Sequence, residues 1–195
     1  MKKLMIFTVL VVITLSSISC NKDKNSLSEE EKAGLSYMLE EEKLARDVYI
    51  YLYNLWGINQ FDNIKNSEVN HINSIATILE DYNINYNILP EGQFSNEHLQ
   101  TLYNQLISEG EISNSNALHV GATIEDLDIV DLAEYINATS NTRLIKTYEK
   151  LQCGSQNHLR SFVSAIEDNG ESYTPQFLTE TEYNSILSNS HTSCN

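Results

Sequence analysis

The segment FDNIKNSEVNHINSIATILEDY, residues 61–82, places apolar side chains at the three- and four-residue spacing of an amphipathic helix. Glu68 and His71 interrupt this apolar stripe one helical turn apart, where a buried face normally carries Leu, Ile or Ala. A carboxylate and an imidazole on a buried face need a partner, because an unpaired buried charge is costly. Two interpretations stay open: the two groups satisfy each other, or both of them bind a metal ion.

Three other predicted helices show the same anomaly near their middles. Glu42 interrupts the apolar stripe of the first helix, Glu125 and Asp128 lie one turn apart on the third long helix, and His158 lies on the last. Asp131 fits the spacing as well as Asp128 does. If the four helices pack together, these acids and imidazoles converge, and convergence favours a metal site over isolated buried pairs.

The helix signals define an all-α chain. A capping box at Ser28 and Glu31 opens the first helix, and Gly57 ends it. The predicted helices span residues 28–56, 64–82, 95–110, 123–138 and 140–168, followed by a short amphipathic turn near 183–187. The helix at 95–110 lies within a long crossover between the second and third long helices. Two helix pairs joined by such a crossover predict a four-helix bundle with one extra helix.

Four blocks of sequence carry a family resemblance. They are YMLEEEKLARDVY at 37–49, SEVNH at 67–71, VGATIEDLDIVDL at 120–132 and GSQNHLRSF at 154–162. In this order they resemble the ferritin-like, rubrerythrin-type carboxylate proteins, and in particular the family called domain of unknown function 2202. The resemblance extends over about residues 28–183. It implies a ferritin-like four-helix bundle with a centre for iron, two ions being the number such bundles hold, and with manganese or zinc as alternatives.

The resemblance also implies which residues act. The implied metal ligands are Glu42, Glu68, His71, Glu125, Asp128 and His158. Tyr49 lies two turns after Glu42 on the same stripe; it is a core side chain in the commoner interpretation and a catalytic phenol in the other. The family pattern expects a second glutamate three residues before His158, where Ser155 stands. Three alternatives follow: Asp128 replaces that glutamate, the site holds one metal, or it keeps only a hydrogen-bonded polar core.

The first twenty residues predict export. Two lysines, an apolar run of about fifteen residues and Ser19-Cys20 are typical of a lipoprotein signal, with 1–19 removed and Cys20 lipidated. Residues 20–27 then form a polar tether, 28–188 the bundle and 189–195 a tail. We therefore expect a membrane-anchored lipoprotein of the bacterial cell envelope. Cys153 and Cys194 either pair in that oxidising compartment or remain two free thiols.

The charge of the chain limits its partners. A formal net charge of −15 repels nucleic acid and anionic lipid, so contact with a membrane is expected only through the lipid at Cys20. An electron donor and a second copy of the chain, as a homodimer, are the remaining candidate partners. The expected function is metal binding in the bundle core with reduction of oxygen or peroxide. The alternative is a non-catalytic metal-binding or interaction lipoprotein with a helical scaffold.

Overall fold

The computed structural model describes residues 26–190 together with 193 and 194, and this part of the chain contains helices and no strands. The helices are α1 (Glu29–Trp56), α2 (Asn59–Asp81), α3 (Glu97–Gly110), α4 (Asn114–Ala138), α5 (Thr142–Asp168) and α6 (Glu180–Ser188). The prediction of an all-helical chain is confirmed for these residues. The predicted signal segment 1–19 and the lipidation site Cys20 lie outside them.

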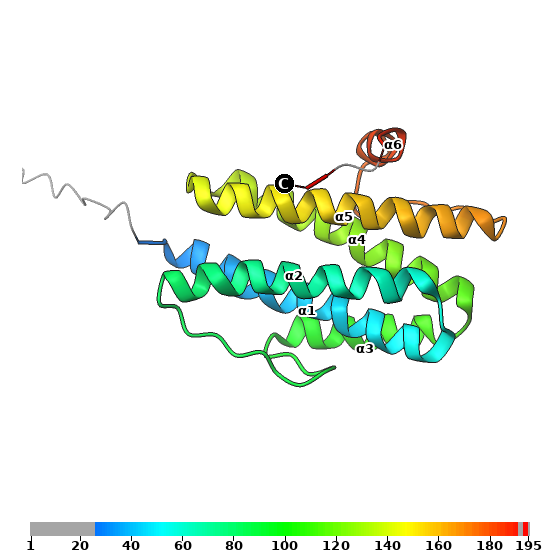
Figure 1. Cartoon of the computed structure of the whole chain (residues 1–195), viewed down its shortest axis with the longest axis horizontal. Helices are drawn as coiled ribbons and strands as arrows, with labels where there is room; N and C mark the ends of the chain where they lie inside the picture. The colour runs from blue at the N-terminus through cyan, green and yellow to red at the C-terminus, as the bar shows by residue number, and fades with distance from the viewer. Residues whose placement is uncertain (1–25, 191–192, 195) are drawn as a thin grey trace, which may run out of the picture.

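The helix ends explain the hairpin at the start of the bundle. Ser28 and Glu31 form the predicted capping box, in which the Ser28 hydroxyl accepts from the Glu31 amide at 3.1 Å. Gly57 ends α1 with φ at 66°, a left-handed conformation that glycine adopts without steric cost. Only Gly57 and Ile58 separate α1 from α2, so the two helices must run antiparallel and side by side (Figure 1).

Two helix pairs make up the body of the molecule. α1 packs along α2 and α4 packs along α5, while α1–α4 and α2–α5 contacts join the pairs. The predicted extra helix is α3, which lies in the crossover after α2 and contacts α1 and α4 (Figure 1). α6 contacts α5 on the other side of the molecule and is seen nearly end-on (Figure 1). None of the described helices is long and apolar enough to cross a bilayer.

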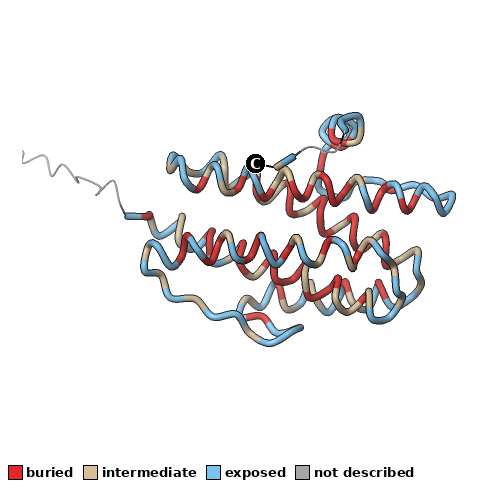
Figure 2. The backbone as a smooth tube through the Cα atoms, viewed as in Figure 1, coloured by how far each residue is buried: buried red, intermediate tan, exposed pale blue. Residues whose placement is uncertain are grey.

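The apolar core is divided into two parts along the helices. One part includes Leu35, Leu79 and Tyr148, and the other includes Leu52 and Phe162. Glu42 on α1, Glu68 and His71 on α2 and His158 on α5 lie between these two parts, and Glu125 on α4 meets them there, so a polar layer separates two apolar layers. Figure 2 shows the buried residues on the facing sides of the helices. Apolar packing above and below fixes the height of the polar layer in the bundle.

Two helices start earlier than the sequence indicated. α2 begins at Asn59 rather than near 64, and α4 begins at Asn114 rather than near 123. Gly121 suggested a helix boundary, but it lies inside α4, where a Cβ would come within 2.4 Å of the Phe162 ring on α5. The glycine therefore permits close packing between two helices, and tertiary contact overrides its weak helix propensity.

A buried ion pair fixes the crossover to α1. Lys43 Nζ lies 2.5 Å from Asp47 Oδ2 and donates to the carbonyl oxygens of Pro90 and Gln93, both at 3.0 Å. Asp47 also accepts from the Gly92 amide at 3.0 Å. Side chains of α1 thus form hydrogen bonds with backbone groups in the loop before α3. These bonds stabilise the loop, which contains no helix or strand.

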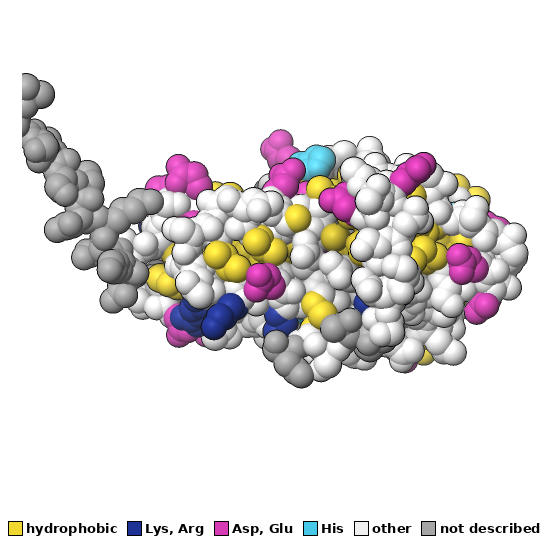
Figure 3. All heavy atoms as spheres, turned by 90° about the horizontal axis from the view of Figure 1, so that it is seen from above, with side chains coloured by type: hydrophobic (Ala, Val, Ile, Leu, Met, Phe, Trp, Pro, Cys, Tyr) yellow, Lys and Arg dark blue, Asp and Glu magenta, His cyan; other side chains and the backbone are white. Residues whose placement is uncertain are grey.

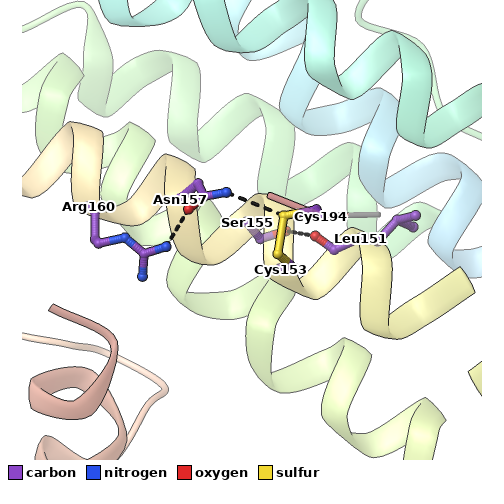
Figure 4. Close-up of a disulfide and its surroundings, with 6 residues drawn as sticks. All are labelled: Leu151, Cys153, Ser155, Asn157, Arg160 and Cys194. Carbon is purple, nitrogen blue, oxygen red and sulfur yellow. Dashed lines mark hydrogen bonds between the residues drawn. A yellow bond between two sulfur atoms is a disulfide. The ribbon is translucent and has the colours of Figure 1, made fainter. Parts of the chain in front are cut away.

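The C-terminal segment is held at two points. Asp126, fully buried on α4, accepts from the Tyr173 hydroxyl at 2.8 Å and from the Leu178 amide at 2.8 Å. A disulfide joins Cys153 on α5 to Cys194 in the tail, which resolves the alternative left open by the sequence in favour of pairing (Figure 4). Acidic side chains are scattered over the face of the molecule shown in Figure 3, in keeping with the net charge.

Candidate metal centre

The polar layer brings together residues from all four long helices. Glu42 comes from α1, Glu68 and His71 from α2, Glu125 from α4 and His158 from α5, and all of them are buried. Helical periodicity explains the convergence, because each residue replaces an apolar side chain on the inward stripe of its helix. The structure thus places five of the six sequence-predicted ligands in one cluster.

Two three-residue groups in this cluster have the geometry of metal sites. Glu42, Glu68 and His71 form one group, and Glu68, Glu125 and His158 form the other; in each group one donor atom per residue lies within 4.8 Å of the others. His71 Nδ1 is 3.1 Å from Glu42 Oε2 and 3.0 Å from Glu68 Oε2. His158 Nδ1 is 3.0 Å from Glu68 Oε1 and 3.4 Å from Glu125 Oε2. The carboxylate of Glu68 therefore belongs to both groups, with one oxygen facing each imidazole.

Several oxygen and nitrogen atoms that could bind a metal in this cluster form no hydrogen bond. They are Glu42 Oε1, Glu68 Oε1 and His158 Nδ1; the same holds for Asp128 Oδ1 beside the cluster. Glu68 Oε1 and His158 Nδ1 are 3.0 Å apart, yet their angles do not form a hydrogen bond. Buried polar atoms nearly always have a hydrogen-bond or metal partner. Two such atoms that lie close together without a hydrogen bond between them are therefore consistent with a third atom or ion that binds both. A cation between them meets that requirement.

Asp128, the sixth predicted ligand, lies beside the cluster but outside both groups. Its Oδ2 is 2.5 Å from the hydroxyl of Ser155, the residue that stands where the family pattern expects glutamate. Ser155 Oγ is also 3.1 Å from the Leu151 carbonyl, so its single proton is donated to one of two oxygens. Asp131, the alternative by spacing, is only half-buried and interacts with Glu41 instead. Of the two aspartates, Asp128 is therefore the one that can act at the centre.

Tyr49 contacts the centre directly. Its hydroxyl donates to Glu125 Oε1 at 2.5 Å, and its ring packs against Phe61 and Phe162. Burial and the neighbouring carboxylate of Glu125 raise the pKa of this phenol well above its usual value, so it stays protonated. The side chain is thus both a core residue, as the commoner interpretation held, and a hydrogen-bond donor to a candidate ligand.

A glycine makes room for one of the imidazoles. Gly154 on α5 faces His71 on α2, and a Cβ at position 154 would lie 2.7 Å from His71 Nε2. Any larger side chain would displace the ring, which stacks on His158 with centroids 5.7 Å apart. The sequence reasoning assigned no role to this glycine, because its partner is a residue on another helix.

The acids of the centre carry more negative charge than the imidazoles balance. Burial raises the pKa of Glu42 to about 7 against the opposing effect of His71, and burial with the charges of Glu42 and Glu125 raises that of Asp128 well above its usual value. The pKa of Glu68 is instead lowered, because two imidazoles outweigh its burial. Burial lowers the pKa of His158, but Glu125 and Glu68 raise it to about 10. Without a metal ion, bound protons compensate the excess charge.

These shifts predict that the metal-free protein loses stability as pH rises. In the folded protein the pKa of Glu42 is raised from 4.5 to about 7, and the pKa of His158 is raised from 6.5 to about 10. A group whose pKa is higher in the folded state than in the unfolded state stabilises the fold at pH values below its unfolded-state pKa. This stabilisation is lost as the pH rises to the folded-state pKa. We expect the free energy of unfolding, measured by denaturant titration with a chelator present, to fall between pH 4.5 and 10. Glu42→Gln should flatten the part below pH 7, and a wild-type curve that rises over this range would contradict the assignment.

Sequence reasoning missed one more buried acid beside the centre. Glu41 is 3% exposed and lies beside Asp131, with which its carboxyl group interacts. Burial, followed by the charges of Asp128 and Asp131, raises the pKa of Glu41 well above its usual value. Its position next to Glu42 in a run of three glutamates concealed it, because such runs usually lie on a solvated surface.

Comparison with known proteins gives the family. A family model described as "Uncharacterized protein domain (DUF2202)" matches residues 31–190. The chain belongs to this family. This DUF2202 chain is 48% identical over 169 residues to the uncharacterized protein MJ0754 of Methanocaldococcus jannaschii, covering 86% of this chain and 91% of that protein. It also resembles the crystal structure of hypothetical protein MJ0754 from Methanococcus jannaschii with a TM-score of 0.84 and 48% identity, covering 85% of this chain and 96% of the other. The assignment from sequence to the DUF2202 family is confirmed, and the helical arrangement is shared with this solved relative.

Proposed function

We propose that this protein is a ferritin-like carboxylate protein that binds one or two transition-metal ions and reduces oxygen or peroxide. The observation that carries the proposal is Glu68, whose two oxygens face the imidazoles of His71 and His158, each 3.0 Å away. A carboxylate shared between two His-carboxylate groups is the arrangement by which four-helix bundles hold a pair of metals. The two helix pairs joined by the crossover with α3 support the ferritin-like assignment.

The donor set fits such ions. Glu42, Glu68 and His71 would hold one ion, and Glu68, Glu125 and His158 the other. Mixed carboxylate and imidazole ligands suit iron first, with manganese or zinc as alternatives. Glu42 Oε1, which accepts no hydrogen bond, supports this fit, because a cation would satisfy it. Asp128 and the Ser155 hydroxyl would position a ligand or a water beside the ions rather than replace the missing glutamate.

The chain's own side chains would prepare the site for reaction. Bound iron would supply the electrons for oxygen or peroxide, a reaction class taken by analogy from the fold family. Tyr49 would hold Glu125 in place through its hydroxyl and is the nearest buried phenol that can give a proton. Phe61 and Phe162, both fully buried against Tyr49, would keep bulk water away from that side.

The cellular setting is part of the same proposal. We expect export, lipidation at Cys20 and anchoring in the bacterial cell envelope, with an electron donor and a second copy of the chain as partners. The Cys153–Cys194 disulfide supports an oxidising compartment, because disulfides persist outside the reducing cytosol.

One observation favours the alternative of a non-catalytic metal-binding or interaction lipoprotein. Ser155 occupies the position of an expected carboxylate, and its hydroxyl already bonds to Asp128. A centre with one carboxylate fewer holds a second ion less firmly, and one ion alone does not supply paired redox chemistry.

Metal reconstitution separates the two functions. Purified protein is loaded with Fe(II) without oxygen, its iron content is measured, and oxygen or peroxide is then added while the absorption of ferric iron is followed. We expect two irons per chain and rapid oxidation. Retained metal without oxidation supports the non-catalytic alternative, and a protein that keeps no iron, manganese or zinc overturns both.

A further inference from the structure

A polar groove lies between α2 and α5, directly beside the candidate metal centre. Its volume is about 780 Å³, and it is lined by residues of α2, by residues of α5 and by Ser193 and Cys194 of the tail. His71 and His158 belong to this lining. The groove is therefore the place where the surface of the protein and the centre meet.

The two imidazoles are the exposed edge of an otherwise closed centre. The side chains of His71 and His158 are 9% and 11% exposed, whereas those of Glu42, Glu68 and Glu125 are at most 3% exposed. Both rings present this small exposed edge to the groove, and Gly154 lies between them on its wall. Because Gly154 has no side chain, α5 packs closely on the His71 ring and only a small edge of that ring faces the groove. A molecule that reaches the ligands through the groove must therefore be small.

The groove differs in charge from the chain as a whole. Its described lining contains hydroxyl and amide side chains, among them Ser67, Asn70 and Ser74, one lysine, Lys150, and no carboxylate. The chain carries a formal net charge of −15, whereas the described lining of the groove has a lysine and no acidic residue. Such a lining offers hydrogen bonds to a polar ligand and does not repel an anion.

The rim of the groove is covalently fixed. The Cys153–Cys194 disulfide attaches the tail to α5 immediately before Gly154, and Asn157 donates to Cys194 Sγ at 3.3 Å (Figure 4). Ser193 and Cys194 therefore form a wall on the side of the groove next to α5. A fixed wall keeps the opening at one size, which favours selection by size over induced fit.

We propose that this groove is the binding and access site for a small, hydrogen-bonding ligand of the centre, uncharged or singly negative, such as hydrogen peroxide. The inference rests on the proposed function and adds the route and the class of substrate. Ser67 and Ser74 flank His71 one turn to either side; the Ser74 hydroxyl donates to the Asn70 carbonyl at 2.8 Å, so its oxygen is left to accept a hydrogen bond from a ligand. Lys150 attracts an anion toward the imidazole edges. Bulky organic substrates would not reach the ligands, because only the small exposed edges of the two rings face the groove.

Two variants test the route without altering a candidate ligand. Ser74→Tyr places a large side chain in the groove, and Val69→Tyr places the same side chain on the exposed face of α2 as its control. Cobalt(II) uptake by the metal-free protein and azide binding to the loaded protein are followed by absorption. We expect Ser74→Tyr to slow both about tenfold with unchanged final metal content, and Val69→Tyr to match wild type.

A second pair tests the charge. Lys150→Gln should weaken azide binding about threefold at low salt, whereas Lys146→Gln, one turn earlier and outside the groove lining, should not. Wild-type protein that binds cobalt while all four variants take up metal and azide like wild type overturns the groove and leaves the metal centre standing. Wild-type protein that binds no metal overturns both.

Discussion

Glu68→Gln is expected to remove metal from both halves of the centre, whereas Glu42→Gln and Glu125→Gln should each weaken one half. Glu68 is the residue shared by the two ligand groups, and an amide keeps its shape but loses the negative charge that binds a cation. With free metal at about 100 times its Kd, binding should stabilise the wild-type fold by about 2.7 kcal/mol. For a chain of this size that corresponds to a rise in Tm of roughly 5–10 °C, which Glu68→Gln should abolish.

The measurement is metal content after desalting, together with thermal unfolding with and without added metal. Glu149→Gln is the matched control, because Glu149 is an exposed acid on α5 that belongs to neither ligand group. It should bind metal and gain stability like wild type. If Glu68→Gln keeps the wild-type metal content, Glu68 does not bridge two ions, and the interpretation of the centre as a metal pair is wrong.

Helical periodicity was sufficient to predict which residues meet at the centre. Glu42, Glu68, His71, Glu125 and His158 each replace an apolar residue on an inward stripe, and the structure brings all five together. Periodicity works here because each helix buries one stripe, so a polar residue on that stripe must point inward. The same argument could not separate Asp128 from Asp131, because their difference in burial depends on the neighbouring helices.

The buried polar residues that hold loops could not be found in this way. Lys43 and Asp47 have helical spacing typical of an exposed ion pair, but besides Arg46, which also pairs with Asp47, they bond to backbone groups 45 to 50 residues away. Asp126 likewise accepts from amides of the tail about 50 residues later. Spacing along one helix carries no information about which loop will lie against it. The prediction that a helix begins after Gly121 was wrong for a related reason, since this glycine is needed for close packing against Phe162 on another helix.

Breaking the Lys43–Asp47 pair should cause the largest loss of stability of any single change outside the centre. Both side chains are at most 2% exposed, so Asp47→Asn leaves the Lys43 ammonium group in the interior without a counter-ion and also removes the ion pair with Arg46. Such a loss typically costs about 3–5 kcal/mol. Adding Lys43→Met to the same chain should restore part of it, because the buried ammonium group is then gone and the amide oxygen introduced by Asp47→Asn can still accept from the Gly92 amide. Denaturant titration of the two single variants and the double variant measures this coupling.

Asp62→Asn, which breaks the exposed pair with Lys65, should change stability by about 0.5 kcal/mol or less. Equal losses at Asp47 and Asp62 would mean that the crossover is held by its own turn and not by α1.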